Sequence, residues 1–151
     1  MPGIQYRELI EADLPFIASM LADWQTEEYW HQRVSGYYRR ELHPRKALLP
    51  RVMYVATDSG SIVGFIAGHL TERFGCDGEL QWVNVTPGFR KAGIATELLH
   101  LLAKWFVGQN AFYICVDPGN EQSRKFYARN GAENLNEHWM GWKDIRIVFR
   151  T

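Results

Sequence analysis

The sequence has little cysteine and no excess charge of either sign, and each shortage excludes a class of protein. Cys76 and Cys115 lack CxxC spacing and companion cysteines, so we expect neither a zinc site nor a disulfide framework and interpret both as reduced thiols. The 17 basic residues balance 17 acidic ones, so no overall field attracts nucleic acid or an anionic membrane. We therefore expect any partner to be recognised at a local site.

Long apolar runs are also missing, because no window approaches the roughly 18 residues that a membrane helix needs. The first residues carry Glu8, Glu11 and Asp13 and show no basic region followed by an apolar one, so we expect no secretory signal and a cytoplasmic location. His31 and His138 lack companions at metal-ligand spacing, so no metal is expected. What is present is core material, since 46% of the 151 residues are hydrophobic and 14% aromatic. The length predicts a single domain over residues 1–151.

The spacing of apolar residues predicts the order of the elements. Helices are expected within 11–24, with Asp13 as N-cap, within 26–42, with Thr26 as cap, over about 94–107, and from just after 119 to 130. Strands are expected over 4–8, 51–57, 61–70, 78–85, 111–117, 132–139 and 143–149. Residues 138–144 are expected to form a hairpin loop between the last two strands. This order predicts a mixed α/β sheet with helices on its faces.

The stretch "VNVTPGFRKAGIATELL", residues 83–99, leaves a strand through a basic turn of low bulk and enters a helix. A helix N-terminus exposes unpaired N–H groups and binds anions when the backbone can be approached closely. Gly93 and Ala95 permit that approach, and Arg90 and Lys91 add positive charge. Neither the G-x-x-x-x-G-K-[ST] run nor G-x-G-x-x-G is present, so the expected anion is a phosphate of a different cofactor. A plain solvated connector is the competing interpretation.

This turn resembles the acyl-CoA pyrophosphate loop of the GNAT superfamily of N-acyltransferases, R/Q-x-x-G-x-G/A, matched at Arg90, Gly93 and Ala95. The later "NEQSRKFYARNGA" is similar to the family segment N-x-x-[AS]-x-x-x-Y-x-x-x-G, matched at four positions, Asn120, Ser123, Tyr127 and Gly131. Ala95 stands where glycine is commoner, and Ala132 follows Gly131 where an aromatic residue is usual. The resemblance implies the GNAT fold, a mixed, mostly antiparallel sheet with helices on both faces.

The resemblance also implies where acetyl-CoA binds. Main-chain N–H groups would hold the pyrophosphate, and the main chain of Val83 and Val85 would pair with the pantetheine arm. The Val85 N–H, left free where two parallel strands splay apart, would polarise the thioester carbonyl. The cofactor-binding residues predicted on this basis are Val83, Val85, Arg90, Lys91, Ala92, Gly93, Ile94, Ala95, Thr96, Asn120, Ser123 and Tyr127.

Two side chains are predicted to move protons during direct transfer from thioester to amine. Tyr127 matches the family's acid tyrosine, and a phenol near the sulfur can supply the proton of the departing thiolate. Glu79 is predicted as the base, because even spacing along the strand would turn it to the face of Val83 and Val85. A packed tyrosine and an exposed strand-end glutamate are the competing interpretations.

The acceptor pocket is predicted to take side chains from Trp24, Glu27, Glu28, Tyr29 and Trp30. Trp139, Met140 and Trp142 are expected to line the acceptor mouth or a contact in a homodimer. The predicted function is acetyl-CoA-dependent N-acetylation of a primary amine on a small molecule, within a ternary complex. The alternatives are a protein or peptide N-acetyltransferase, a non-catalytic acyl-CoA sensor, and a site for a nucleotide phosphate.

Overall fold

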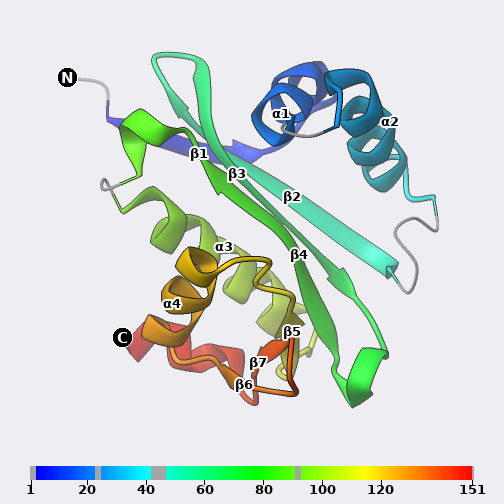
Figure 1. The fold of residues 1–151 in the computed structure, drawn as a ribbon, viewed down its shortest axis with the longest axis vertical. Coiled ribbons are helices and arrows are strands. Elements are labelled where there is room, and N and C mark those ends of the chain that lie inside the picture. Colours follow the sequence, from blue (N-terminus) through cyan, green and yellow to red (C-terminus); the bar gives the residue numbers. More distant parts are fainter. Residues whose placement is uncertain (1–2, 23–24, 42–46, 91–92, 151) are drawn as a thin grey trace.

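The computed structural model describes residues 3–22, 25–41, 47–90 and 93–150. Its centre is a seven-stranded sheet in the order β1-β2-β3-β4-β5-β7-β6 (Figure 1). In the described chain, β4 and β5 run parallel and every other neighbouring pair runs antiparallel, which confirms the predicted mixed, mostly antiparallel sheet. The strands are β1 Ile4–Glu8, β2 Leu48–Asp58, β3 Ser61–Leu70, β4 Gly78–Val85, β5 Ile114–Val116, β6 Glu133–Asn134 and β7 Met140–Trp142.

Helices cover both faces of this sheet. The helices α1 (Leu14–Leu21) and α2 (Glu27–Tyr38) pack together on one face, and α3 (Ile94–Gly108) and α4 (Glu121–Arg129) lie on the other (Figure 1). Short 3₁₀ turns connect these elements: η1 Glu11–Asp13, η2 Arg73–Gly75, η3 Pro87–Phe89 and η4 Ile145–Arg150. The core is therefore divided by the sheet into an α1–α2 layer and an α3–α4 layer.

Close approach of α3 to the sheet depends on glycines in β3 and β4. A Cβ added at Gly68 would lie 2.7 Å from Leu102, and one added at Gly78 would lie 2.5 Å from Phe106. Both distances are shorter than real carbon contacts, so a larger residue at either position would force the Leu102 or Phe106 side chain, or α3 itself, to shift. These glycines fix the distance between α3 and the strand that carries the candidate site.

Of the two predicted helix caps, one makes the capping hydrogen bond with its side chain and the other does not. Thr26 caps α2, since its Oγ1 accepts a hydrogen bond from the Tyr29 N–H at 3.1 Å. Asp13 stands at the N-cap position of α1, but its carboxylate accepts from the Ile10 N–H and from Arg7 instead. The predicted N-cap position is thus confirmed, while the side chain joins β1 to η1.

The C-terminal predictions need correction. Residues 145–150 form η4 rather than the predicted strand over 143–149, because the buried residues Ile145 and Val148 are three apart, while Ile147 and Phe149 are each 41% exposed. The predicted strand over 132–139 is reduced to β6, Glu133–Asn134. The predicted hairpin loop over 138–144 contains strand β7, which pairs with both β5 and β6.

Candidate active site

An opening between β4 and β5 forms the centre of the candidate site. The two strands pair only over Gly78–Leu80 and Ile114–Val116 in the described structure, while β4 continues to Val85. On the other edge of β4, the Thr86 N–H donates to the Val63 carbonyl at 2.8 Å. In antiparallel strands, opposite residues alternate between hydrogen-bonded and non-hydrogen-bonded pairs. Because Val63 and Thr86 are a bonded pair, the next pair, Gly64 and Val85, is not hydrogen-bonded. The main-chain groups of Val85, and by the same alternation those of Val83, therefore face the opening.

The basic turn lies at the end of this opening. Arg90 Nε donates to the main-chain oxygen of Val85 at 3.0 Å, which ties the turn to the strand. Gly93 is the N-cap of α3 with φ 76°, a left-handed conformation that favours glycine, and an added Cβ would meet no atom within 4 Å. Lys91 and Ala92, predicted to bind the cofactor, lie outside the described residues.

The first turn of α3 offers main-chain donors beside this glycine. The helix begins at Ile94, and Glu97 is the residue whose N–H donates back to the Gly93 carbonyl, at 3.1 Å. Within the described residues, the N–H groups of Ile94, Ala95 and Thr96 have no main-chain acceptor, so they are available to another one. The Ile94 side chain is fully buried beneath the turn. These donors and Arg90 make the turn able to bind an anion.

The helix α4 brings Tyr127 to the α3–α4 layer, where Val85 is also buried. Its side chain is 3% exposed, and its ring makes edge contacts with Phe126 and Trp142, with centroid separations of 5.4 and 5.8 Å. Burial raises the pKa of Tyr127, and the negative charge of Asp117 raises it further. The phenol therefore stays protonated at neutral pH, as a proton donor requires.

Asn120 and Ser123 stand together at the N-terminus of α4. The Asn120 Oδ1 accepts from the Ser123 N–H at 2.8 Å and caps the helix. The Asn120 carboxamide thus has a structural partner on its oxygen, and its NH₂ group keeps two donors for a ligand. Both residues were predicted to bind the cofactor, and their place on the chain segment that follows β5 keeps that prediction consistent with the geometry.

Glu79 does not share a face with Val83 and Val85, contrary to the argument from even spacing. Trp82 pairs with Ala67 and Leu80 with Gly68, so Gln81 is an extra residue, a β-bulge that shifts the alternation by one position. Val83 and Val85 consequently pack on the α3 side, whereas Glu79 points to the α1–α2 side. Glu79 lies on the opposite face of the sheet, at the closed end of the opening.

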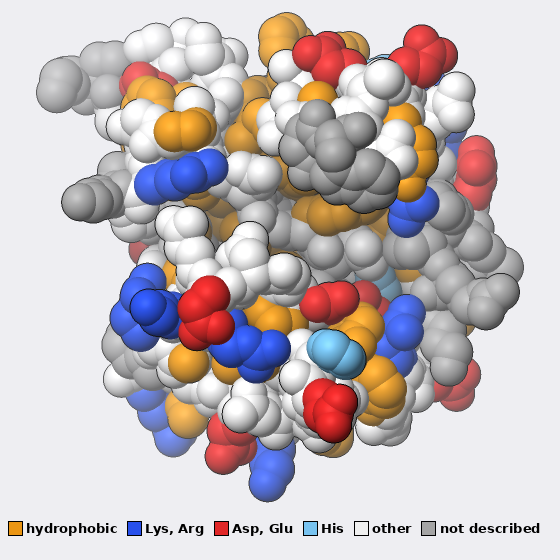
Figure 2. All heavy atoms as spheres, in the orientation of Figure 1, with side chains coloured by type: hydrophobic (Ala, Val, Ile, Leu, Met, Phe, Trp, Pro, Cys, Tyr) orange, Lys and Arg blue, Asp and Glu red, His pale blue; other side chains and the backbone are white. Residues whose placement is uncertain are grey.

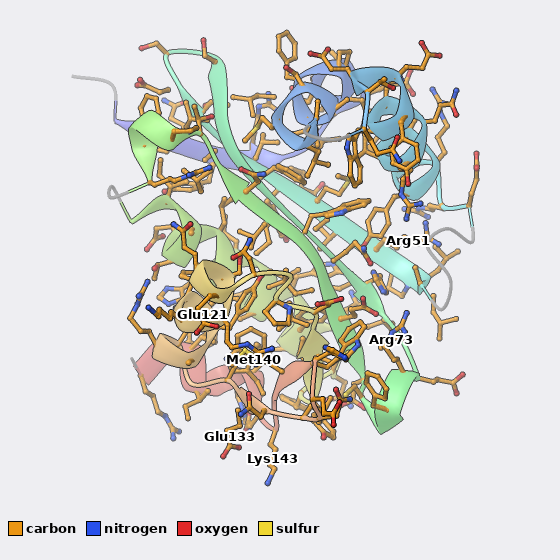
Figure 3. All side chains as sticks on the ribbon, viewed as in Figure 1. Arg51, Arg73, Glu121, Glu133, Met140 and Lys143 are labelled. Carbon is orange, nitrogen blue, oxygen red and sulfur yellow. The ribbon has the colours of Figure 1, made fainter. Side chains whose placement is uncertain are left out.

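Glu79 is not an exposed strand end either, because it is 4% exposed and held by two donors. Arg73, which comes from η2 and is labelled in Figure 3, donates from Nε to Glu79 Oε1 at 3.1 Å. His69 Nε2 lies 3.3 Å from the same oxygen, and Tyr37 Oη lies 2.7 Å from His69 Nδ1. None of the described residues hydrogen-bonds Glu79 Oε2, so that oxygen remains able to accept a proton.

The predicted acceptor residues are only partly brought together. Trp24 lies outside the described residues. Glu27 and Glu28 are exposed in the first turn of α2, and Tyr29 and Trp30 meet edge-to-face with a centroid separation of 5.1 Å. Figure 2 shows hydrophobic side chains between the α1–α2 pair and α4, with acidic and basic groups mixed around them.

The prediction for Trp139, Met140 and Trp142 is wrong for two of the three residues. Met140 and Trp142 are buried at 2% and 1% exposure, and Trp142 Nε1 donates to the Asn130 carbonyl at 3.0 Å, so neither lines a mouth. Trp139 is half-buried, with Arg73 Cζ 4.7 Å from its ring centroid. His69 and Arg73 were not predicted from the sequence, although a histidine inside a buried apolar strand is a signal that could have identified the first.

Comparison with known proteins agrees with this geometry. Residues 8–132 match the model of the acetyltransferase (GNAT) family. The chain belongs to that family. None of the curated proteins matches it in sequence. No described helix of this GNAT chain is long and apolar enough to cross a membrane, and its described residues contain no group of three or more histidine, cysteine, aspartate or glutamate side chains that could hold a metal ion.

Solved structures share the fold at low sequence identity. The PaiA N-acetyltransferase from Thermoplasma acidophilum, in complex with coenzyme A, superposes with a TM-score of 0.68 at 15% identity, over 94% of this chain and 99% of that one. A GNAT family acetyltransferase from Brucella melitensis, in complex with acetyl-CoA, gives 0.66 at 16% identity over 93% and 88%. The ribosomal-protein-alanine N-acetyltransferase from Brucella melitensis gives 0.65 at 21% identity over 91% and 98%.

Proposed function

We propose that this GNAT protein is an acetyl-CoA-dependent N-acetyltransferase that transfers the acetyl group to a primary amine of a small molecule by direct attack. The observation that supports it most is the opening between β4 and β5, with main-chain groups of Val83 and Val85 on one side and the turn before α3 at its end. Two of the structural relatives hold coenzyme A or acetyl-CoA.

The residues present fit this cosubstrate. The N–H groups of residues 94–96 and the Arg90 guanidinium would hold the pyrophosphate, and the open side of Gly93 allows its close approach. The main chain of Val83 and Val85 would pair with the pantetheine amides like an added strand. Tyr127 would donate a hydrogen bond to the sulfur and supply its proton as the thiolate departs.

Distance along β4 decides which N–H can stabilise the oxyanion. At about 3.3 Å per residue, Val85 lies at most about 20 Å from Glu79 along the strand and Val83 at most about 13 Å, because the bulge at Gln81 shortens both distances. A donor and a base acting on one tetrahedral centre must lie close to each other. We therefore assign the oxyanion to Val83 rather than to the predicted Val85, whose N–H would bind the pantetheine arm.

Glu79 would remove the proton of the attacking amine through Oε2, by way of a water molecule. A primary ammonium has a pKa of about 10 and needs such an acceptor at neutral pH. The opposite-face position of Glu79 suits this role, because the amine must approach the thioester from the side that coenzyme A does not occupy. Glu27, Glu28, Tyr29 and Trp30 would line that approach from α2.

The experiment that tests this function follows release of free thiol from acetyl-CoA with a panel of polyamines, aminoglycosides, amino acids and short peptides. Turnover with a small amine supports the proposal, and the product should carry one acetyl group by mass spectrometry. Turnover with peptides alone would assign the protein to peptide acetylation, as in the ribosomal-protein-alanine relative. Tight acetyl-CoA binding without turnover on any amine would favour the sensor, and tighter binding of ATP than of coenzyme A would refute the cofactor assignment.

A further inference from the structure

His69 is the least expected side chain in β3, a strand otherwise made of apolar residues and glycine after its first serine. It is 0% exposed, yet each ring nitrogen has a partner: Tyr37 Oη at Nδ1, 2.7 Å away, and Glu79 Oε1 at Nε2, 3.3 Å away. A buried imidazole is tolerated because both nitrogens are satisfied. The three side chains come from α2, β3 and β4, so they connect the α1–α2 layer to the candidate base.

With a neutral imidazole, the chemistry of these groups fixes the direction of both hydrogen bonds. An ionised carboxylate only accepts, so His69 Nε2 must carry the proton and donate to Glu79 Oε1. Nδ1 is then the acceptor, and the Tyr37 hydroxyl must donate to it. Burial raises the pKa of Tyr37 well above its ordinary value, so that hydroxyl keeps its proton. All donors in the array therefore point toward the carboxylate.

Tyr37 is itself held in place by further contacts. The Arg51 guanidinium lies 4.9 Å from the Tyr37 ring centroid and donates to the main-chain oxygens of Tyr37 and Ala47 at 3.0 and 2.7 Å. The Tyr37 ring also contacts Trp82 edge-to-face at 5.1 Å. The hydroxyl is thus presented to His69 by a rigid support.

We propose that His69, oriented by Tyr37, is a positioning residue that holds Glu79 Oε1 and thereby presents Oε2 to the attacking amine. This inference rests on the proposed function, because it assigns a purpose to a base that acts there. Two donors, His69 Nε2 and Arg73 Nε, share Oε1 and restrict rotation of the carboxylate. Tyr37 bonds the other ring nitrogen and so holds the imidazole in the orientation that Glu79 needs.

Other titratable groups also face this carboxylate. Cys115 from β5 and Cys76, which follows η2, both have a pKa raised mainly by burial and in part by the charge of Glu79. Both thiols are therefore neutral at physiological pH. Among the described residues, the charged groups in direct contact with Glu79 are Arg73 and, when protonated, His69.

Nuclear magnetic resonance of the imidazole nitrogens tests the array without any substrate. The wild-type protein should show the Nε2–H tautomer of His69, which the carboxylate of Glu79 selects. Tyr37→Phe should keep this tautomer but move the Nδ1 resonance to that of an unbonded nitrogen, because the hydroxyl that donates to Nδ1 is gone. Tyr54→Phe, which removes a half-buried hydroxyl from β2, is the matched control and should leave the Nδ1 resonance unchanged. An Nδ1–H tautomer in the wild-type protein would overturn the assignment.

Kinetics test the purpose of the array. We expect His69→Leu to lower kcat about tenfold or more, to leave the KM for acetyl-CoA unchanged, and to move the acidic limb of the pH–rate profile up by about one pH unit, because a carboxylate that loses a donor is protonated at higher pH. His69→Gln keeps an N–H donor and should recover most of that shift. His100→Gln, whose histidine bonds the Val148 carbonyl from α3, is the matched control.

The outcomes separate this inference from the proposed function. An unchanged pH profile in His69→Leu, with intact folding and acetyl-CoA binding, would refute the positioning role alone. Equal defects in His69→Gln and His69→Leu, without a shift of the acidic limb, would also refute it, since they would indicate loss of packing. Absence of turnover by the wild-type protein with every amine would refute the proposed function and, with it, the catalytic purpose of the array.

Discussion

Arg90 and Val85 are joined by a hydrogen bond from the guanidinium Nε to the main-chain oxygen, with a length of 3.0 Å. The two residues are five positions apart, and the bond holds the turn between β4 and α3 against the edge of β4 that faces the opening. It also occupies the Val85 carbonyl, so the N–H of that residue is the group left for a ligand. The same side chain thus shapes the turn and brings a positive charge to it.

Replacement of Arg90 should separate these two effects. Arg90→Ala loses both the charge and the bond to Val85, and we expect the Kd for coenzyme A to rise about tenfold. Arg90→Lys keeps the charge but not the planar Nε–H donor, so its affinity should lie between those of Arg90→Ala and the wild type. Calorimetric titration measures all three. Arg129→Ala, at the exposed end of α4, serves as control, and an Arg90→Ala affinity equal to the control's would contradict the account.

Tyr127→Phe should lower kcat about 100-fold or more while the Kd for acetyl-CoA stays the same, because in the proposed mechanism the hydroxyl acts only as the thiolate leaves. The raised pKa of Tyr127 adds a prediction about pH. The phenol keeps its proton up to at least pH 10, so it should cause no descending limb in the pH–rate profile below that value. Initial rates between pH 6 and 10 check both points. Full activity in Tyr127→Phe would move the proton donor to another group.

Protonation of the Asp13 carboxylate should lower the free energy of unfolding at acidic pH. Burial by itself raises the pKa of this carboxyl, but hydrogen bonds from Arg7 and the Ile10 N–H, with the charge of Arg7, outweigh that effect and leave the pKa lowered. A lowered folded-state pKa stabilises the protein above the unfolded value of about 3.9, and this contribution is lost as the pH falls through the folded value.

Asp13→Asn should therefore lower the unfolding free energy by about 1 kcal/mol at pH 7, a small amount because Arg7 is partly exposed and screened by solvent. The loss should become smaller as the pH is lowered toward 3. Urea denaturation at several pH values measures the difference in unfolding free energy. Glu11→Gln, which removes an exposed carboxylate from the same turn, is the control. A cost independent of pH would show that the charge of Asp13 is unimportant.

Gly78→Ala should destabilise the fold by about 1–3 kcal/mol, because the new methyl group would meet Phe106 and Ile114 at 2.5 and 2.9 Å. Gly88→Ala meets no atom within 4 Å and should change the unfolding free energy by no more than about 0.5 kcal/mol. Chemical denaturation of the pair gives the comparison. Equal stabilities would mean that α3 can move away from the sheet without cost.

The elements that the sequence predicts well are those with long and regular spacing. The hairpin of β2 and β3, strand β4 and helix α3 each have many apolar residues in one period, and the turn residues between them are distinctive. The strand predicted for the C-terminal segment was wrong because the apolar residues there fit both the period of a strand and that of a 3₁₀ turn. Alternation through Ile145, Ile147 and Phe149 favours a strand, but burial of Ile145 and Val148 selects a 3₁₀ turn against α3.

The candidate site shows a different limit of prediction. A β-bulge depends on pairing between strands, and nothing in the residues around Gln81 reveals that it is the extra one. Glu79 was therefore predicted on the wrong face of the sheet. Its predicted role as the base stays consistent with its buried contacts. Contacts between elements distant in sequence, such as Tyr37 with His69, depend on the packing of α2 against the sheet and have no local signal.

The central claim is that the turn from β4 to α3 holds the pyrophosphate of coenzyme A, and Gly93 offers the most direct measurement of it. Titration calorimetry of coenzyme A into the wild-type protein and into Gly93→Val should show binding that the variant weakens at least about tenfold, because valine disfavours φ 76° and places methyl groups where the phosphate must approach. Thermal unfolding of both proteins provides the check on folding. Equal affinity in a folded Gly93→Val variant, or no binding of coenzyme A by the wild-type protein, would contradict the account.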